Sequence, residues 1–149
     1  MLRLSKKTWL ALEAVVDIAI NARPDPVQSK EITARQGIPQ RYLEQVMQQL
    51  VHAGILKGMR GPRGGYRLAG ERRRIPGGEV GRVVGAMEAP VEPVAATPSE
   101  LGERVIAPLW QEVQKELMEK LDAFTIEDLC RKAEETGVGN SKSAADFII

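Results

Sequence analysis

The stretch from Gln40 to Ala53 carries side chains of the kinds that recognise DNA bases. Arginine can bind guanine through two hydrogen bonds, glutamine can bind adenine in the same way, and glutamate can accept one from cytosine. The helical period of the apolar residues predicts a helix that buries Leu43, Val46, Met47 and Leu50. Its outward face would then present Arg41, Glu44, Gln45, Gln48 and His52. This face either reads base edges or is an ordinary solvated surface on which Arg41 pairs with Glu44.

Two further arginines, Arg60 and Arg63, lie in the sequence Arg60-Gly61-Pro62-Arg63-Gly64-Gly65. Ile55 to Met59 and Tyr66 to Ala69 predict short strands on either side, so the loop would be a hairpin tip, or wing. Arginine is favoured in a narrow minor groove, where the negative potential is enhanced. The loop lies between strands and lacks a terminal Gly-Lys-Ser/Thr, which excludes a nucleotide-binding P-loop.

The elements before Gln40 would position these side chains. Ser5 can cap a first helix that ends before Pro24 and Pro26, and Ser29 can cap a short helix from Lys30 to Gln36. A short helix, a tight turn at Gly37-Ile38-Pro39 and a longer helix that ends at Gly54 are typical of a helix-turn-helix. The inward side of the first two helices would be Trp9, Leu12, Val16, Ile20 and Ile32.

The second half of the chain predicts three more helices. Arg72 to Arg74 would lie in a linker, Glu79 to Glu88 would be a short helix, and the three prolines between Ala89 and Ser99 indicate a loop. A helix from about Glu100 to Leu121 would carry one apolar stripe that needs a partner to cover it: Ile106, Trp110, Val113, Leu117 and Leu121. A last helix, Ile126 to Ala133, would begin behind Thr125 with Asp128 completing a capping box.

These elements predict a mostly α protein with a small two-stranded wing and a long C-terminal dimerisation helix. We expect residues 1–75 to form a winged helix-turn-helix DNA-binding domain and residues 76–99 a connecting helix with a Pro-rich loop. Residues 100–134 would be the dimerisation helices, and residues 135–149 a flexible tail.

The charge is divided between the two halves of the chain. Residues 1–74 carry 14 basic and 6 acidic side chains, a net charge of +8, and the remaining residues carry 7 basic and 14 acidic ones, a net charge of −7. A basic half joined to an acidic half indicates a head that binds a polyanion, or charges segregated by chance on solvated surfaces.

Composition excludes several other classes. Aromatic residues make up only 4% of the chain, which disfavours a stacking platform for single-stranded nucleic acid. No apolar run is long enough to span a membrane, and no signal peptide is indicated. The single cysteine cannot form an internal disulfide, so we expect a reducing cytoplasm.

Several motifs resemble those of one family over roughly residues 2–130. The most specific is Arg60-Gly61-Pro62-Arg63-Gly64-Gly65-Tyr66, and the chain is similar in this to the Rrf-two (Rrf2) family of bacterial transcriptional regulators, which includes IscR, NsrR and CymR. The other matching segments are Arg3-Leu4-Ser5, Gln36-Gly37-Ile38, Tyr42-Leu43-Glu44-Gln45, Ala53-Gly54-Ile55-Leu56, Glu79-Val80 to Glu88, Leu109-Trp110 and Thr125-Ile126-Glu127-Asp128-Leu129.

The resemblance implies a dimer that binds an imperfect palindrome and whose long C-terminal helices cross. The positions that match family DNA contacts are Arg41, Glu44, Gln45 and Arg60, whereas Arg63 stands where most relatives have glycine. With their neighbours, the predicted DNA-binding residues are Ser29, Gln40, Arg41, Tyr42, Glu44, Gln45, Gln48, His52, Arg60 and Arg63.

Many members of that family hold an iron–sulfur cluster with three cysteines, often joined by a histidine, in the segment before the long helix. Here Ala89 to Pro108 contains neither residue type, and Arg104 and Ala107 stand at the positions of the last cysteine and the histidine. We therefore expect no cluster and no other cofactor. Cys130 is either a buried small hydrophobe or a redox switch, and His52 is expected to meet phosphate or solvent.

The sequence thus predicts a homodimeric DNA-binding transcriptional regulator, a repressor, with no catalytic or metal site. The alternative is a winged-helix protein-interaction module that no longer binds DNA, and a more distant one is an enzyme or metal sensor. Whether a small molecule or a protein acts as effector stays open.

Overall fold

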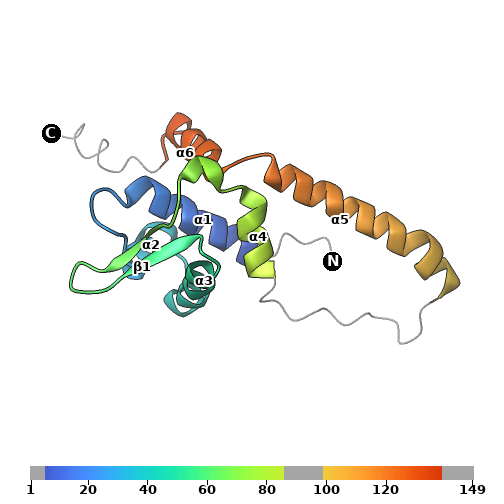
Figure 1. Cartoon of the computed structure of the whole chain (residues 1–149), viewed down its shortest axis with the longest axis horizontal. Coiled ribbons are helices and arrows are strands. Elements are labelled where there is room, and N and C mark those ends of the chain that lie inside the picture. The colour runs from blue at the N-terminus through green and yellow to red at the C-terminus, as the bar shows by residue number, and fades with distance from the viewer. Residues whose placement is uncertain (1–5, 86–98, 139–149) are drawn as a thin grey trace.

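The computed structural model describes residues 6–85 and 99–138. Figure 1 shows packed helices with a two-stranded antiparallel hairpin at their edge, the mostly α winged helix-turn-helix arrangement that the sequence predicts. In chain order the elements are α1 (Lys6–Asn21), α2 (Ser29–Gln36), α3 (Gln40–His52), β1 (Leu56–Met59), β2 (Gly65–Leu68), the 3-10 turn η1 (Arg72–Arg74), α4 (Gly77–Gly85), the π-helical turn η2 (Gly102–Ile106), α5 (Ala107–Asp122) and α6 (Ile126–Glu135).

The hydrophobic core lies around α1. Its small residues Ala11 and Ala14 are fully buried, together with Val15 and Ile18. The same core includes Leu43 and Leu50 of α3, Val80 and Val84 of α4, and Ile126 and Cys130 of α6. We call this packed unit, α1 to α4 with β1, β2 and α6, the head. Helices α4 and α6 are therefore part of the head, although they lie outside residues 1–75.

The predicted inward stripe of α1 is wrong. The structure buries the face with Ala11 and Ile18, whereas Trp9 is 66% exposed and Leu12, Val16 and Ile20 are only half-buried. Helix α1 is apolar nearly all round, and such a helix buries most of its surface. Its small residues allow α3 and α4 to approach closely, so the larger side chains remain on the open side.

Helix α2 begins one residue earlier than predicted. Ser29 is its first residue rather than its N-cap, and the N-cap is Gln28. The backbone N–H of Gln28 donates to the carboxylate of Glu31 at 2.7 Å, which satisfies a donor at the helix start. Helix α2 ends at Gly37, and the buried Ile38 fixes the turn into α3 as predicted.

An ion pair with a buried carboxylate connects α1 to the end of α2. The carboxylate of Asp17 is fully buried and accepts hydrogen bonds from Nε and Nη2 of Arg35 at 2.9 and 2.7 Å. It also accepts one from Nε2 of Gln36 at 2.9 Å. The hydrogen bonds to Asp17 raise the pKa of Arg35. These contacts therefore join α1 to α2, the first helix of the helix-turn-helix.

The sequence predicted that Arg72 to Arg74 lie in a linker, but the structure holds this basic run against α6. It forms η1, and Nε of Arg72 donates to Oε2 of Glu127 in α6 at 2.7 Å. Ile75 is buried, and Pro76 pairs with Thr125 in a short antiparallel bridge. The segment after the wing is thus held against α6.

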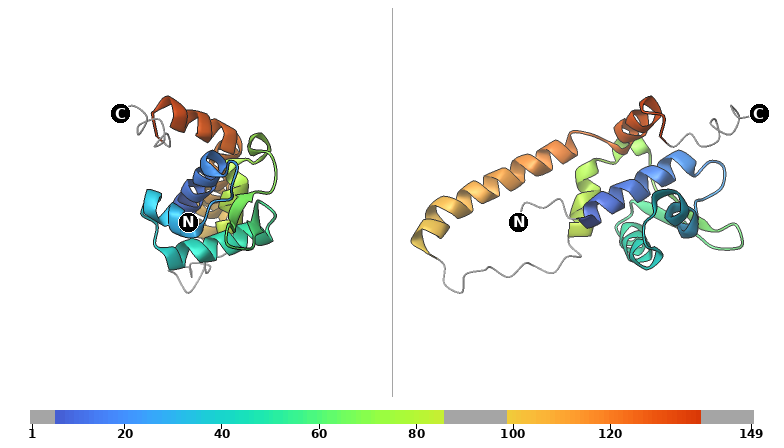
Figure 2. Two further views of the ribbon diagram at one scale, coloured as in Figure 1. Left: turned by 90° about the vertical axis from the view of Figure 1, so that its left-hand side faces the viewer. Right: turned by 180° about the vertical axis from the view of Figure 1, so that it is seen from behind.

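Helix α5 leaves the head as a long arm, which Figures 1 and 2 show from opposite sides. The predicted helix from Glu100 is continuous, but its first turns are π-helical, with the N–H of Ala107 donating to the carbonyl of Gly102. Pro108 follows directly, and a proline in a helix removes a donor and crowds the preceding turn, which accounts for the wider turn.

The base of α5 packs closely on α4. A Cβ at Gly77 would lie 2.3 Å from the ring of Phe124 and 3.0 Å from the carbonyl oxygen of Leu121, and one at Gly78 would lie 2.0 Å from a carboxylate oxygen of Asp122. Glycine at position 77 permits this approach, because both an aromatic ring and a backbone carbonyl lie in the way of a Cβ there, whereas at position 78 the Asp122 side chain would have to turn away. Arg82 of α4 also pairs with Asp122.

Helix α6 begins as predicted. Oγ1 of Thr125 accepts from the N–H of Asp128 at 3.2 Å, and the N–H of Thr125 donates to Asp128 at 2.9 Å. The predictions for Ser5, Met87, Glu88, residues 89–98 and the end of the tail lie outside the described residues. Within those described residues, no helix combines the length and the apolar character needed to cross a membrane.

Candidate nucleic-acid interface

Helix α3 has the two faces that the sequence predicts. Leu43, Val46, Met47 and Leu50 are its buried residues. Its outward side chains are all exposed: Arg41, Glu44, Gln45, Gln48 and His52. Glu44 accepts a hydrogen bond from Nε2 of Gln40 at 3.2 Å, and the alternative pair of Glu44 with Arg41 is not formed in the structure. The guanidinium of Arg41 makes no ion pair within the described residues and is available to a partner.

The wing is a tight hairpin whose two arginines are exposed. Strands β1 and β2 pair from Leu56 with Leu68 to Met59 with Gly65, one residue from the predicted bounds. The N–H of Gly64 donates to the carbonyl of Gly61 at 2.8 Å, and a Cβ at Gly64 would lie 2.5 Å from the carbonyl oxygen of Met59. Glycine is therefore required for the loop to fold back and present Arg60 and Arg63.

A hollow of about 630 Å³ lies between the wing, the start of α2 and the start of α3. It brings three predicted residues together, namely Ser29, Gln40 and Arg60. Gln28 and Lys30 also line it, and the sequence analysis missed both. Lys30 lies in the first turn of α2, where backbone N–H groups and the helix dipole favour an anion, so its position could have indicated a phosphate contact.

The other predicted DNA-binding residues lie around this hollow. Gln48 and His52 line a second, smaller hollow of about 330 Å³ beside Gly58 and Tyr66. Arg41, Glu44 and Gln45 extend from the exposed side of α3 outside both hollows.

Tyr42 differs from its neighbours because it is half-buried against the core. Nζ of Lys7 lies 5.9 Å from the centroid of its ring, within range of a cation–π contact. Lys7 is a second cation near α3 that the sequence analysis did not single out.

The predicted dimer stripe runs along α5 from an exposed end to a buried one. Ile106 and Trp110 are 48% and 41% exposed, Val113 and Leu117 are half-buried, and Leu121 is only 8% exposed. Leu121 is thus covered by its own head and holds α5 in place, whereas the far end of the stripe is uncovered within the described residues.

Cys130 is buried in α6. Burial raises the pKa of its thiol, and the nearby guanidinium of Arg72 opposes this shift in part. The protonated thiol is a weak nucleophile, so the structure favours the buried hydrophobe over the redox switch.

Residues 4–132 match the model of the Rrf2 family, described as an iron-dependent transcriptional regulator. The chain is 34% identical to Protein rrf2 of Nitratidesulfovibrio vulgaris over 134 residues, which cover 89% of each chain. It is 30% identical to the HTH-type transcriptional regulator IscR of Vibrio campbellii, over 89% of this chain and 80% of that one.

Solved structures agree with the sequence relatives. The structure of CymR (YrzC), the global cysteine regulator of B. subtilis, is 32% identical with a TM-score of 0.69, over 89% of this chain and 98% of that chain. The structure of T. potens IscR is 35% identical with a TM-score of 0.72, over 91% and 90% of the two chains.

The family description names iron, but the residues of this chain do not fit an iron–sulfur cluster. Such clusters are held mainly by cysteine thiolates, and this chain has one cysteine and one histidine. Cys130 is buried in α6, whereas His52 is exposed at the end of α3. Across residues 6–85 and 99–138, no three His, Cys, Asp or Glu side chains come together as metal ligands.

Proposed function

The chain belongs to the Rrf2 family of transcriptional regulators, and we propose that it is a homodimeric repressor that binds an imperfect palindrome without an iron–sulfur cluster. Each head would place α3 in a major groove and the wing in the adjacent minor groove. Because its target is chromosomal DNA, the proposed dimer would act in the cytoplasm.

One observation carries this proposal most directly. The hollow between α2, α3 and the wing is lined by Lys30, Gln40 and Arg60, and the polar face of α3 opens beside it. Lysine and arginine suit phosphate oxygens, whereas glutamine and arginine also suit base edges. A convex helix flanked by a cationic loop matches the shape of a DNA groove better than that of an enclosed substrate site.

The dimer is proposed from two apolar surfaces on the same chain. The far end of α5 and the turn before it expose Leu101, Val105, Ile106, Leu109 and Trp110, between 41% and 65%. A groove of about 470 Å³ on the head is lined by Trp9, Leu12 and Val16 of α1 with Phe124 and Leu129. Two arms that cross around a two-fold axis would cover both surfaces with a second copy of the chain.

The proposal predicts specific, strongly salt-dependent binding to duplex DNA. Phosphate contacts release counterions, so the logarithm of the affinity should fall linearly with that of the salt concentration. For about 6 to 10 contacts per dimer, affinity should fall by roughly 10³ to 10⁵ between 50 and 200 mM salt. Genomic fragments selected by the protein and titrated by fluorescence anisotropy would measure this. No binding to any fragment at low salt would instead favour the protein-interaction module.

Arg60→Ala is expected to weaken operator binding by about 1–3 kcal/mol if Arg60 contacts a base. The matched control is Arg73→Ala, which removes the same charge from an exposed position paired only with Glu71 within the described residues. Arg72 is unsuitable as a control because it is paired with Glu127. Anisotropy titrations of both variants at one salt concentration would measure the difference. Equal, small losses in both variants would place Arg60 outside the contact surface.

A further inference from the structure

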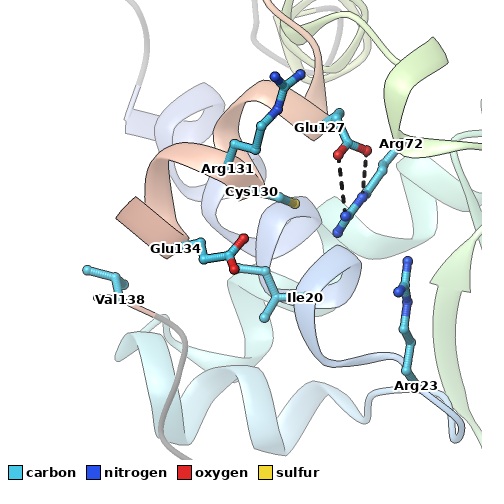
Figure 3. Close-up of a pocket in the computed structure, with 8 residues that line it drawn as sticks. All are labelled: Ile20, Arg23, Arg72, Glu127, Cys130, Arg131, Glu134 and Val138. Carbon is cyan, nitrogen blue, oxygen red and sulfur yellow. Dashed lines mark hydrogen bonds and ion pairs between the residues drawn. The ribbon is translucent and has the colours of Figure 1, made fainter. Parts of the chain in front are cut away.

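Another cavity of the head shares no residue with the two hollows of the proposed DNA interface. It measures about 210 Å³ and lies where the end of α1, the turn η1 and α6 meet (Figure 3). Arg23, Arg72 and Arg131 line it, together with Cys130 and Ile20. These residues come from three separate parts of the sequence, so only the folded chain assembles them.

Two of the three arginines of this cavity are paired with carboxylates, and the third is not. Arg72 pairs with Glu127, with donor–acceptor distances of 2.7 and 3.4 Å. Arg131 pairs with Asp128 at 3.0 Å. Arg23 has no ion pair or side-chain hydrogen bond in the described parts of the chain, yet Figure 3 shows its guanidinium pointing toward that of Arg72. The remaining carboxylate, Glu134, lies on the other side of Cys130.

We propose that this cavity binds a small organic anion, with a carboxylate or phosphate group held between Arg23 and Arg72, and that this anion is the effector of the regulator. Guanidinium groups bind both kinds of anion through paired, charge-assisted hydrogen bonds. The cavity volume of about 210 Å³ corresponds to about seven waters, at roughly 30 Å³ each, so it has room for the anionic group of a small molecule. Ile20 and Cys130 provide a less polar wall for its carbon part.

The position of Arg23 connects the cavity to the DNA interface. Pro24 follows it, and the carbonyl of Pro24 accepts a hydrogen bond from Arg67 in β2. Val27 of the same loop forms two backbone hydrogen bonds with Tyr66, of 3.0 and 2.7 Å. Gln28, the next residue, lines the hollow beside the wing. An anion that repositions Arg23 would therefore act on the wing and on the start of α2.

Binding is tested by thermal unfolding of the full chain in inorganic phosphate and in succinate, with sodium chloride of equal ionic strength as the reference. We expect either anion to raise the midpoint in a saturable way. Arg23→Ala should lower the affinity for the anion by roughly tenfold or more, since it removes a charged hydrogen-bond donor. Arg73→Ala, which lies outside the cavity, should keep the response of the parent protein. An absent response, or an equal one in Arg23→Ala, would overturn the site.

The effector role rests on the proposed function, so it is measured separately. At constant ionic strength, the saturating anion should change operator affinity in the parent protein and leave that of Arg23→Ala unchanged, and DNA should change anion affinity by the same factor. Stabilisation by the anion without any such change would refute the effector role. If the parent protein binds no DNA but is stabilised by the anion, the proposed function fails and the site stands.

Discussion

Arg35→Ala is expected to lower the free energy of unfolding by about 3 kcal/mol, because it leaves the carboxylate of Asp17 buried without its cation. That carboxylate is 0% exposed, and of its hydrogen bonds within residues 6–85 and 99–138 only the one from Gln36 would remain. For a chain of this size the loss corresponds to a fall in the unfolding midpoint of roughly 10 °C. Urea or thermal unfolding followed by circular dichroism would measure it.

Arg41→Ala is the matched control for Arg35→Ala. It removes the same charge from the next helix, at an exposed position without an ion pair in the described residues. Its stability should stay within about 0.5 kcal/mol of the parent, as for most surface changes, whereas its operator affinity should fall. Superimposable unfolding curves for Arg35→Ala and the parent would mean that the Asp17 pair does not hold the helix-turn-helix in place.

Trp110→Glu is expected to give a folded protein that is largely monomeric and binds the operator weakly. Trp110 is 41% exposed on the arm, so a charge there disturbs the proposed interface more than the fold of one chain. Loss of an exposed tryptophan from the proposed interface, with a charge in its place, should weaken the dimer on the order of a hundredfold. Light scattering and operator titration on one sample would measure both effects.

Gln111→Glu provides the control, since it adds the same charge at an exposed polar position one residue away. It should remain a dimer with parental operator affinity. Leu117→Glu is a less clean test, because Leu117 is half-buried in its own chain and a charge there also tests the fold. A folded, dimeric Trp110→Glu protein would place the interface elsewhere, and a monomer with full operator affinity would show that the heads act independently.

Local patterns predicted much of the fold and of the candidate interface. The buried side of α3 follows from one helical period, and the start of α6 follows from Thr125 and Asp128, three residues apart. The wing follows from Arg60 to Gly65 and its flanking strands. In each case the interactions that determine the structure join residues close together in the sequence.

What the sequence did not predict depends on contacts between distant segments. Helix α1 is apolar on two sides, so its period could not show which side faces α3 and α4. Arg72 and Glu127 are 55 residues apart, and nothing near Arg72 distinguishes it from its two exposed neighbours. Lys30 joins the interface only because the wing folds beside α2.

The glycine contact at the base of α5 has a consequence for how operators evolve. Helix α5 has 16 residues and is about 24 Å long. A change of about 10° in the direction of its axis at the contact with Gly77 and Gly78 would therefore displace its far end by roughly 4 Å. That is close to the rise of one base pair, about 3.4 Å. In the proposed dimer, the spacing between half-sites can therefore drift through substitutions at this pivot, while the bases read by α3 stay the same.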